Sequence, residues 1–581
     1  MRRSQVLRAT AFVAGATLLL SGCADGGGGD DGGAQTGAVF ADCDTNPNAC
    51  NSADPGELQQ GGEVAFALEK NVSNWNLLSS EGNVLETGLV LRAILPATFY
   101  TQPDLTPALN ENLLESAEMT ETNPQTVVYE IRDNASWSDG TPITAADFIY
   151  NWRVQNGRDC PDCSPASIAG FDQVQSVVGS ADGKTVTATY AKPYTDWRGV
   201  WGSGAPLYPA HIAAQHGDID TPQGRAESFT WFGTTVPTYS GGPFQIDDFQ
   251  NNESITLVPN PAWYGPTPSL DRLIFRIITD ATQEPLALQN NEVQIIYPQP
   301  QVDLVQQVRN MPNVSSYVGL GLTWEHYDLN LANRFLAAEP LRDAIFTAID
   351  RQAVIDKTVG QFTDKVEPLN NHNFMPQQDG YTDVVTEFGH GTGDVERARQ
   401  ILTDAGYRIE GGRLITPDGQ PVPPMRIRYT TGNQIRQTQC ELFAQQVKPL
   451  GLTVQVVPTD DLGGTLDQGD YDAIVYAWVA SPFPYGGAVQ LWTTDSGSNF
   501  GDYANPEVDR LINEAASSTD QATAAEQLNQ ANRIMAEDAY VLPLYQKPTF
   551  IALYDNVANV RNNSTLDGPT YNVQEWGLRA N

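Results

Sequence analysis

The sequence is poor in positive charge. Its 581 residues include 33 Lys and Arg against 70 Asp and Glu, which gives a formal net charge of −37 at pH 7. Nucleic acids and anionic lipid surfaces attract basic proteins, so this balance argues against either of them as the ligand. Strong negative charge also keeps a protein in solution, and solubility is the simplest explanation for it.

The sequence also lacks the local patterns that mark several classes of enzyme. Its five histidines form no HExxH pattern, no serine lies in a GxSxG elbow, and no Walker A loop is present. Neighbouring acids such as Asp247 and Asp248 would point to opposite faces of a strand. Carboxylates that come together from distant parts of the chain would escape this test. The sequence nevertheless predicts a protein that is not an enzyme and that needs neither a metal ion nor another cofactor.

An apolar run near the N-terminus, residues 9–20, is too short to cross a bilayer as a mature helix. Three arginines precede it, and it ends in Leu-Ser-Gly-Cys at residues 20–23, which resembles a bacterial lipobox. We therefore expect residues 1–22 to be a lipoprotein signal peptide and Cys23 to carry a lipid at the outer face of the cytoplasmic membrane. A chance occurrence of these four residues is the alternative.

Residues 23–60 are rich in Gly, Asp and Asn and offer little apolar surface to bury. A segment of this composition behaves as a flexible chain, because burial cannot offset the entropy that it would lose on folding. We expect this segment to tether a globular part, which begins near Gly61, to the membrane.

Five cysteines follow Cys23. Outside the cytoplasm, closely spaced pairs favour local disulfides, and the candidates are Cys43 with Cys50 and Cys160 with Cys163. The second pair has the CxxC spacing of a redox motif, but neighbouring Gly and Pro residues favour a disulfide within a loop. Cys440 shares one face of a predicted helix, residues 434–450, with Phe443 and Val447, which predicts a buried free thiol.

The rest of the chain mixes predicted strands with predicted helices and shows no repeat of fixed period. Alternating residues predict strands over residues 126–131 and 185–190. Thr144 is placed to cap a helix, and Asp394 and Asn505 are placed to cap two amphipathic helices. Helices followed by strands indicate α/β packing, in which ligands tend to bind where strands end in a crevice.

Residues 126–153, TVVYEIRDNASWSDGTPITAADFIYNWR, resemble the signature of the peptide-type solute-binding proteins of ABC importers. That family also includes nickel and opine binders. Four further segments follow in the family's order, at residues 241–265, 341–356, 394–407 and 505–515. The resemblance therefore covers residues 61–560, nearly all of the chain that remains after the signal peptide.

The resemblance implies a two-lobed α/β fold of the periplasmic-binding-protein type (type II), in the large class that has an additional inserted domain. The implied boundaries are residues 61–97, 235–318 and 545–581 for lobe I, 98–234 for the inserted domain, and 319–544 for the opposing lobe. It also implies hinge closure on a captured solute and delivery of that solute to a membrane permease. We expect a monomer, with ATP hydrolysed by other chains.

Residues 469–487 are the stretch that most suggests a ligand cleft. A strand predicted from Tyr471 to Trp478 runs into Pro482 and Pro484, which end the strand pairing and predict a rigid aromatic loop. By its place in the family's order, this loop corresponds to a wall of the cleft. An ordinary core strand with a stiff exit turn is the alternative.

Three segments provide the predicted ligand contacts. They are Trp478, Ser481 and Tyr485 from the stretch above, Trp324, His326 and Asn330 from residues 324–330, and Asn76 from the first turn of the globular part. Aromatic rings offer amphipathic surface, while amide and hydroxyl groups can hydrogen-bond a peptide-like backbone.

Ser481 bears on the identity of the ligand. In peptide-binding relatives, an acidic residue three positions after the strand-ending Trp holds the α-amino group of the ligand, and Ser481 stands at that position here. An oligopeptide or a peptide-like solute is the first candidate ligand. Because the carboxylate is missing, a neutral small molecule such as a blocked peptide or a glycoside is the second. A sensor that binds a solute without transporting it is the third possibility.

Overall fold

The structure is a computed structural model that describes residues 38–494 and 496–580. The predicted signal peptide, the lipidation site at Cys23 and tether residues 23–37 lie outside the described residues. The described residues belong to one compact unit, Thr36–Asn581. No helix within them is both long enough and apolar enough to cross a membrane.

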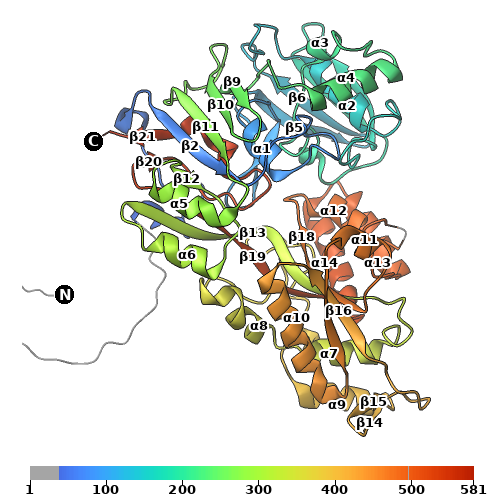
Figure 1. Ribbon diagram of the computed structural model, residues 1–581. Helices are drawn as coiled ribbons and strands as arrows, with labels where there is room; N and C mark the ends of the chain where they lie inside the picture. Colours follow the sequence, from blue (N-terminus) through green and yellow to red (C-terminus); the bar gives the residue numbers. More distant parts are fainter. Residues whose placement is uncertain (1–37, 495, 581) are drawn as a thin grey trace, which may run out of the picture. The chain divides into compact units, whose positions relative to one another are not determined.

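A ten-stranded mixed sheet organises the fold, in the order β17-β16-β18-β13-β19-β12-β2-β11-β10-β9. Two long antiparallel strands, β13 (Val314–Leu329) and β19 (Val541–Tyr554), run side by side and join the two halves of the sheet (Figure 1). Strand pairs on either side of them are parallel, β2 with β11 and β16 with β17 and β18. The remaining strands of this sheet are β2 (Glu63–Leu68), β9 (Phe244–Gln250), β10 (Ser254–Pro259), β11 (Arg272–Ile277), β12 (Ile295–Ile296), β16 (Met425–Thr430), β17 (Val454–Thr459) and β18 (Ala473–Val479).

A second, four-stranded antiparallel sheet lies within the part of the chain predicted to be an inserted domain. The strands predicted over residues 126–131 and 185–190 are present as β6 (Gln125–Ile131) and β8 (Thr185–Tyr190), which pair with each other. Thr144 caps α2 (Ala145–Gln155), because its side chain accepts a hydrogen bond from the backbone N–H of Ala146. Further elements of this part are β3 (Phe99–Thr101), β4 (Pro107–Leu109), β5 (Leu114–Thr122), β7 (Val174–Gly179), α3 (Ala210–Ala213) and α4 (Pro222–Thr234).

Helices accompany the strands in the C-terminal half of the chain. Asp394 and Asn505 cap α9 (Val395–Asp404) and α13 (Pro506–Ala516), the two amphipathic helices that the sequence predicts. α10 (Gln434–Val447) packs along β16 and β17, as α/β packing requires (Figure 1). The other helices are α1 (Leu85–Leu91), α5 (Glu284–Gln289), α6 (Val302–Arg309), α7 (Glu339–Ala348), α8 (Arg351–Lys357), α11 (Leu462–Asp467), α12 (Pro484–Trp492) and α14 (Gln521–Glu537); the remaining short strands are β1 (Leu58–Gln59), β14 (Arg408–Glu410), β15 (Arg413–Ile415), β20 (Val557–Ala558) and β21 (Gly577–Arg579).

Buried apolar side chains form three large groups. The first joins β2 to the four-stranded sheet, the second joins β16 to α7, α9 and α10, and the third joins α12, α13 and α14 to Trp324 of β13. Cys440 is a buried free thiol within the second group, as the sequence predicts. Cys160 and Cys163 form a disulfide in the loop that follows α2.

Residues 38–60 are folded, which corrects the prediction of a flexible tether that extends to residue 60. Phe40 is buried against Tyr317, and a disulfide joins Cys43 to Cys50. β1 pairs with β21 at the other end of the chain. The segment is polar, but its few apolar side chains, its disulfide and its hydrogen bonds to C-terminal residues offset the entropy of ordering it.

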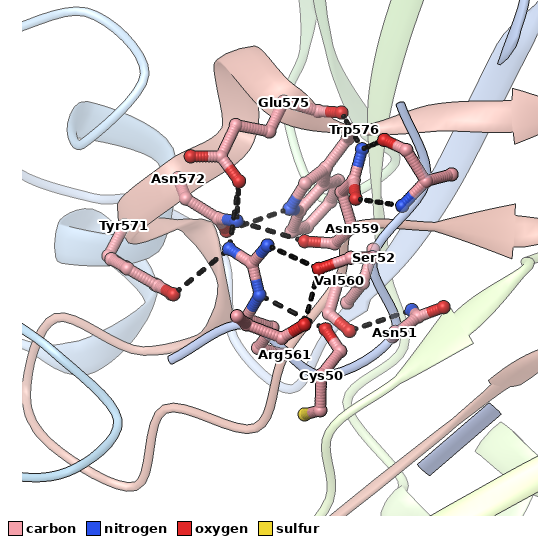
Figure 2. Close-up of polar contacts among 12 residues, drawn as sticks. Cys50, Asn51, Ser52, Asn559, Val560, Arg561, Tyr571, Asn572, Glu575 and Trp576 are labelled. Atoms are coloured by element: carbon pink, nitrogen blue, oxygen red, sulfur yellow. Dashed lines mark hydrogen bonds and ion pairs between the residues drawn. The ribbon is translucent and has the colours of Figure 1, made fainter. Parts of the chain in front are cut away.

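Arg561 makes several of the polar contacts that fasten this N-terminal segment, as Figure 2 shows. Its Nε donates to the carbonyl oxygen of Cys50 at 3.1 Å, and its Nη1 donates to Glu575 Oε2 at 2.8 Å. Asn51 Nδ2 donates to the carbonyl oxygen of Val560 at 2.8 Å. The contact between Arg561 and Cys50 joins residues that are 511 positions apart, so the two ends of the described chain are held together.

The exit of β18 also differs from the prediction. β18 ends before Pro482 as expected, but Pro484 begins the helix α12 instead of extending a loop. Proline is favoured in the first turn of a helix, because that turn leaves backbone N–H groups without intrahelical partners. Tyr485 therefore lies on a helix, and only residues 480–483 form the connecting loop.

Candidate functional site

A cavity of about 240 Å³, here called cavity A, lies where β18 ends. Its lining includes the 480–483 loop together with Gly486, Gly487 and Gln490 of α12 and Leu322 of β13. Segments far away in the sequence complete it, and they include Leu78, Asn83, Arg92, Thr101, several residues between 155 and 205, and residues 565–567. These two sets of residues come from opposite predicted lobes, so cavity A lies where a cleft between lobes would enclose a solute.

A second cavity of about 170 Å³, here called cavity B, shares Pro482 and Phe483 with cavity A. The ring of Phe483 approaches Gly199 so closely that a Cβ atom at this glycine would lie 3.1 Å from the ring. Ser481 Oγ accepts a hydrogen bond from the backbone N–H of Phe483 at 3.1 Å, which stabilises the turn. The 480–483 loop therefore contributes to both cavities.

Thr195 and Asp196, from the predicted inserted domain, bind α13 and α12 of the predicted opposing lobe. Asp196 Oδ2 accepts a hydrogen bond from the backbone N–H of Gly486, in the first turn of α12, at 2.7 Å. Thr195 Oγ1 lies 2.6 Å from the carbonyl oxygen of Ala515 near the end of α13. Burial raises the pKa of Asp196 to about 7, although the backbone hydrogen bonds that it accepts act in the opposite direction.

An ion pair between Arg92 and Asp567 lies in the lining of cavity A. Arg92 Nε donates to Asp567 Oδ1 at 2.8 Å, and the side chains are 9% and 2% exposed. The hydroxyl of Ser203 donates to Asp567 Oδ2 at 2.8 Å, and the backbone N–H of Thr101 donates to the same oxygen. These are the charged side chains that line cavity A among the described residues.

Two of the seven predicted ligand contacts line a cavity. Ser481 lines cavity A, and Tyr485 lines cavity B. Trp478 is half-buried and stacks on Phe500, with ring centroids 6.0 Å apart and an interplanar angle of 10°. Its Nε1 is buried and has no hydrogen-bond partner within the part of the chain that the structure describes.

The structure does not bring the predicted residues of β13 to either cavity. Trp324 and His326 are fully buried, and His326 Nδ1 lies 2.6 Å from Asp328 Oδ1. Asn330 Nδ2 donates to the carbonyl oxygens of Gly469 and Tyr471. Trp324 packs against Trp492 and His326 against Tyr476, while Asn330, which follows β13, binds the segment before β18, so the fold itself uses all three side chains.

Asn76 is also used by the fold itself. Its Nδ2 donates to the carbonyl oxygen of Phe229 at 2.9 Å, and its Oδ1 accepts from the backbone N–H of Leu78 at 3.1 Å. The side chain is 1% exposed and lies outside the linings of both cavities. It therefore stabilises the turn after β2 and lines neither cavity.

Sequence reasoning missed Arg92, Asp567 and Asp196. Arg92 and Asp567 are 475 positions apart, so no local pattern connects them. Phe483 lies within the stretch singled out from the sequence, but it was not among the predicted contacts. Within residues 38–494 and 496–580, no group of three or more His, Cys, Asp or Glu side chains is arranged to hold a metal ion.

These features describe a mixed α/β protein with a cavity that can hold a small solute. The cavity lies between the predicted opposing lobe and the other predicted parts of the chain, and β13 and β19 join the two sides. Residues 108–500 match the family model described as bacterial extracellular solute-binding proteins, family 5. The chain belongs to this family, which confirms the resemblance stated from the sequence. It is the solute-binding protein of an ABC importer, from a family that is not catalytic.

Curated relatives are similar over most of the chain. The oligopeptide-binding protein OppA of Mycobacterium tuberculosis is 30% identical over 514 residues, which cover 88% of this chain and 84% of OppA. The oligopeptide-binding protein AppA of Bacillus subtilis is 22% identical over 560 residues, which cover 93% of this chain and 96% of AppA.

Solved structures confirm the fold class. The periplasmic EDTA-binding protein EppA is 37% identical, with a TM-score of 0.86 over 92% of this chain and 99% of EppA. AppA of Bacillus subtilis, in complex with a nonapeptide, is 20% identical, with a TM-score of 0.70 over 90% of this chain and 100% of AppA.

Proposed function

We propose that this protein captures an oligopeptide or a peptide-like solute in cavity A and delivers it to a membrane permease. Cavity A supports this proposal, because both predicted lobes contribute residues to its lining. Lobe I would comprise residues 61–97, 235–318 and 545–581, with the inserted domain at 98–234 and the opposing lobe at 319–544. The folded segment 38–60 would belong to lobe I, because it pairs with residues of the C-terminal segment.

The mechanism in this proposal is hinge closure. A solute that touches both sets of elements binds the closed form better and shifts the population towards it. Closure would form the hydrogen bond between Asp196 and Gly486 of α12 and the one between Thr195 and Ala515 of α13. Each of them joins the predicted inserted domain to the opposing lobe. Closure would then report occupancy to the permease.

Two relatives support different solutes. OppA, a 30% identical relative, is an oligopeptide-binding protein, and this favours a peptide. EppA, a 37% identical structure, is an EDTA-binding protein, and this favours a small polycarboxylate as the second candidate. A lipid on Cys23, which would hold the mature protein at the outer face of the membrane, belongs to the same proposal and predicts that the mature chain begins with a diacylglyceryl cysteine.

The test is to identify the solute that the purified protein carries. We expect mass spectrometry of material released by denaturation to find peptides, and added peptides to raise the Tm and compact the protein in X-ray scattering. Binding to the native state alone stabilises it by about 2.7 kcal/mol when the ligand is present at one hundred times its Kd. If no peptide is released and a peptide library changes neither Tm nor scattering, the peptide proposal is wrong, and a response to EDTA alone would favour the second candidate.

A further inference from the structure

The guanidinium of Arg92 has unused hydrogen-bond donors. Its Nε donates to Asp567, whereas no acceptor among residues 38–494 and 496–580 pairs with Nη1 or Nη2. The side chain is 9% exposed, and Nη1 and Nη2 are not sealed in the interior, because Arg92 lines cavity A. Donors without a protein partner bind water or a ligand, and charged donors form the stronger hydrogen bonds. The two nitrogens are therefore available to a solute in cavity A.

Three hydrogen bonds from the protein hold the Asp567 carboxylate in place. Arg92 Nε binds Oδ1, while the Ser203 hydroxyl and the Thr101 backbone N–H bind Oδ2. Ser203 and Thr101 anchor the carboxylate, and the carboxylate in turn holds the guanidinium. Asp567 is thus a positioning residue, and Arg92 is the group left to bind a ligand.

The hydrogen-bonding groups of cavity A favour a carboxylate as the ligand group. Arg92 and Asp567 are the charged residues in its described lining; Asp567 accepts three hydrogen bonds from the protein, whereas Arg92 donates one and keeps two nitrogens for a solute. Ser481 offers only a hydroxyl. The planar fork of an arginine matches the two oxygens of a carboxylate, which it binds through two parallel hydrogen bonds.

We infer that Arg92, held by Asp567, is the receptor for a carboxylate of the captured solute, and that the solute needs no free amine. This inference rests on the proposal that the solute is held in cavity A. The ligand class is then a carboxylate-bearing solute, such as a peptide with a free C-terminus and a blocked N-terminus, or a small polycarboxylate. Both candidate solutes considered above can carry such a group.

Matched probes test the inference without any mutation. We expect N-acetyl-trialanine to bind about 10- to 100-fold more tightly than its C-terminal amide, because only the acid can form the charge-assisted pair. Trialanine, with a free amine, should bind no better than the acetylated acid. Citrate and EDTA serve as carboxylate probes without a peptide bond. Isothermal titration calorimetry with the full protein measures each affinity.

Variants then assign the effect to Arg92. Arg92→Gln should abolish the preference for the acid over the amide, and Arg92→Lys should retain part of it, since lysine keeps the charge without the fork. Arg510→Gln, at an exposed arginine of α13, is the matched control and should leave the preference unchanged. Each variant is compared with the original protein by its Tm, so that a folding defect is recognised.

A separate variant is needed to show which cavity holds the carboxylate of the solute. Arg92 also borders a larger cavity near Arg561 and Glu575. Gly487 lines cavity A, and no atom lies within 4 Å of the place that its Cβ would occupy. Gly487→Trp should therefore fill cavity A and abolish binding of the acid. Carboxylate binding that survives this change would overturn the assignment to cavity A.

The outcomes separate the two proposals. If the acid and the amide bind equally well, and Arg92→Gln alters neither, the carboxylate inference is wrong while peptide capture stands. If citrate or EDTA binds in an Arg92-dependent manner and no peptide binds, the carboxylate inference stands and peptide capture is wrong. If none of the probes binds, both are overturned.

Discussion

Two neighbouring aromatic segments of this protein differ in their surroundings. Residues 324–330, at the end of β13 and just after it, and residues 478–485, at the exit of β18, come together where Trp324 pairs with Trp478 in the strand register. Both segments combine aromatic side chains with polar ones. The first is buried and bonded internally, whereas the second supplies residues to two cavities.

The difference comes from position along the strand rather than from residue type. Residues 324–329 lie inside β13, where side chains stand above and below the sheet; Trp324 packs against Trp492 of α12, and His326 packs against Tyr476 of β18. β18 ends at Val479, and residues 480–483 leave the sheet before α12 begins. Ser481, which follows the end of a strand, lines cavity A, whereas Trp324 and His326 within the central strand line neither cavity, although Leu322 of the same strand lines cavity A.

The two segments should differ most in how much their aromatic side chains contribute to the free energy of unfolding. Trp324→Ala should lower the free energy of unfolding by about 3–5 kcal/mol, because the side chain is fully buried against Trp492 and His326. Phe483→Ala, at a half-buried ring between the two cavities, should cost much less stability and should weaken solute binding. Urea denaturation measures the first quantity and calorimetry the second. Equal losses of stability in the two variants would contradict the comparison.

A smaller effect is expected from Asp196, which contacts α12 and should make the stability of the folded protein depend on pH. Its carboxyl pKa rises from 3.8 to about 7 on folding, so between these values the folded protein holds a proton that the unfolded chain has released. The stability from this group is therefore present below about pH 4 and is lost as the pH rises to about 7, by at most about 1.4 kcal/mol per pH unit.

Asp196→Asn should remove this decline while it retains an acceptor for the N–H of Gly486. The check is the difference in unfolding free energy between the two proteins, measured at several pH values from 4 to 8, so that titrations common to both cancel. A difference that does not change with pH would show that Asp196 titrates near its ordinary pKa.

The smallest effect concerns Ser481. Ser481→Asp should raise the affinity for peptides with a free N-terminal amine by about tenfold, since it restores the carboxylate found in peptide-binding relatives. Ser481→Ala is the control, because it also removes the hydroxyl that accepts from Phe483 but adds no charge. Calorimetry with trialanine amide measures the change. No gain in affinity would mean that the 480–483 loop does not face the amine end of a peptide.

Much of the fold could be predicted because its signals are local. Thr144, Asp394 and Asn505 cap the helices that follow them, and alternating residues form β6 and β8 as expected. The family resemblance was carried by five short segments in a fixed order, each of which can be recognised locally. Such features depend on interactions between residues that are close in the sequence.

The candidate site was harder to predict, because its partners are distant in sequence. Arg92 becomes a candidate only when Asp567 and Ser203 are seen beside it. His326 was chosen for its residue type, but it is buried against Tyr476 and Trp478, which are distant in the sequence. Ser481 lines cavity A, next to the prolines whose effect on the strand could be read locally, but its role as a ligand contact stays a prediction.

The joining of the chain's two ends has a consequence for the order of assembly. Synthesis proceeds from the N-terminus, so the residues around Cys50 are made long before Val560 and Arg561, which they bind. A contact that closes a loop of 511 residues carries a high entropic cost and forms slowly unless intervening structure is already in place. Residues 38–60 can therefore make these contacts only after Val560 and Arg561 have been synthesised.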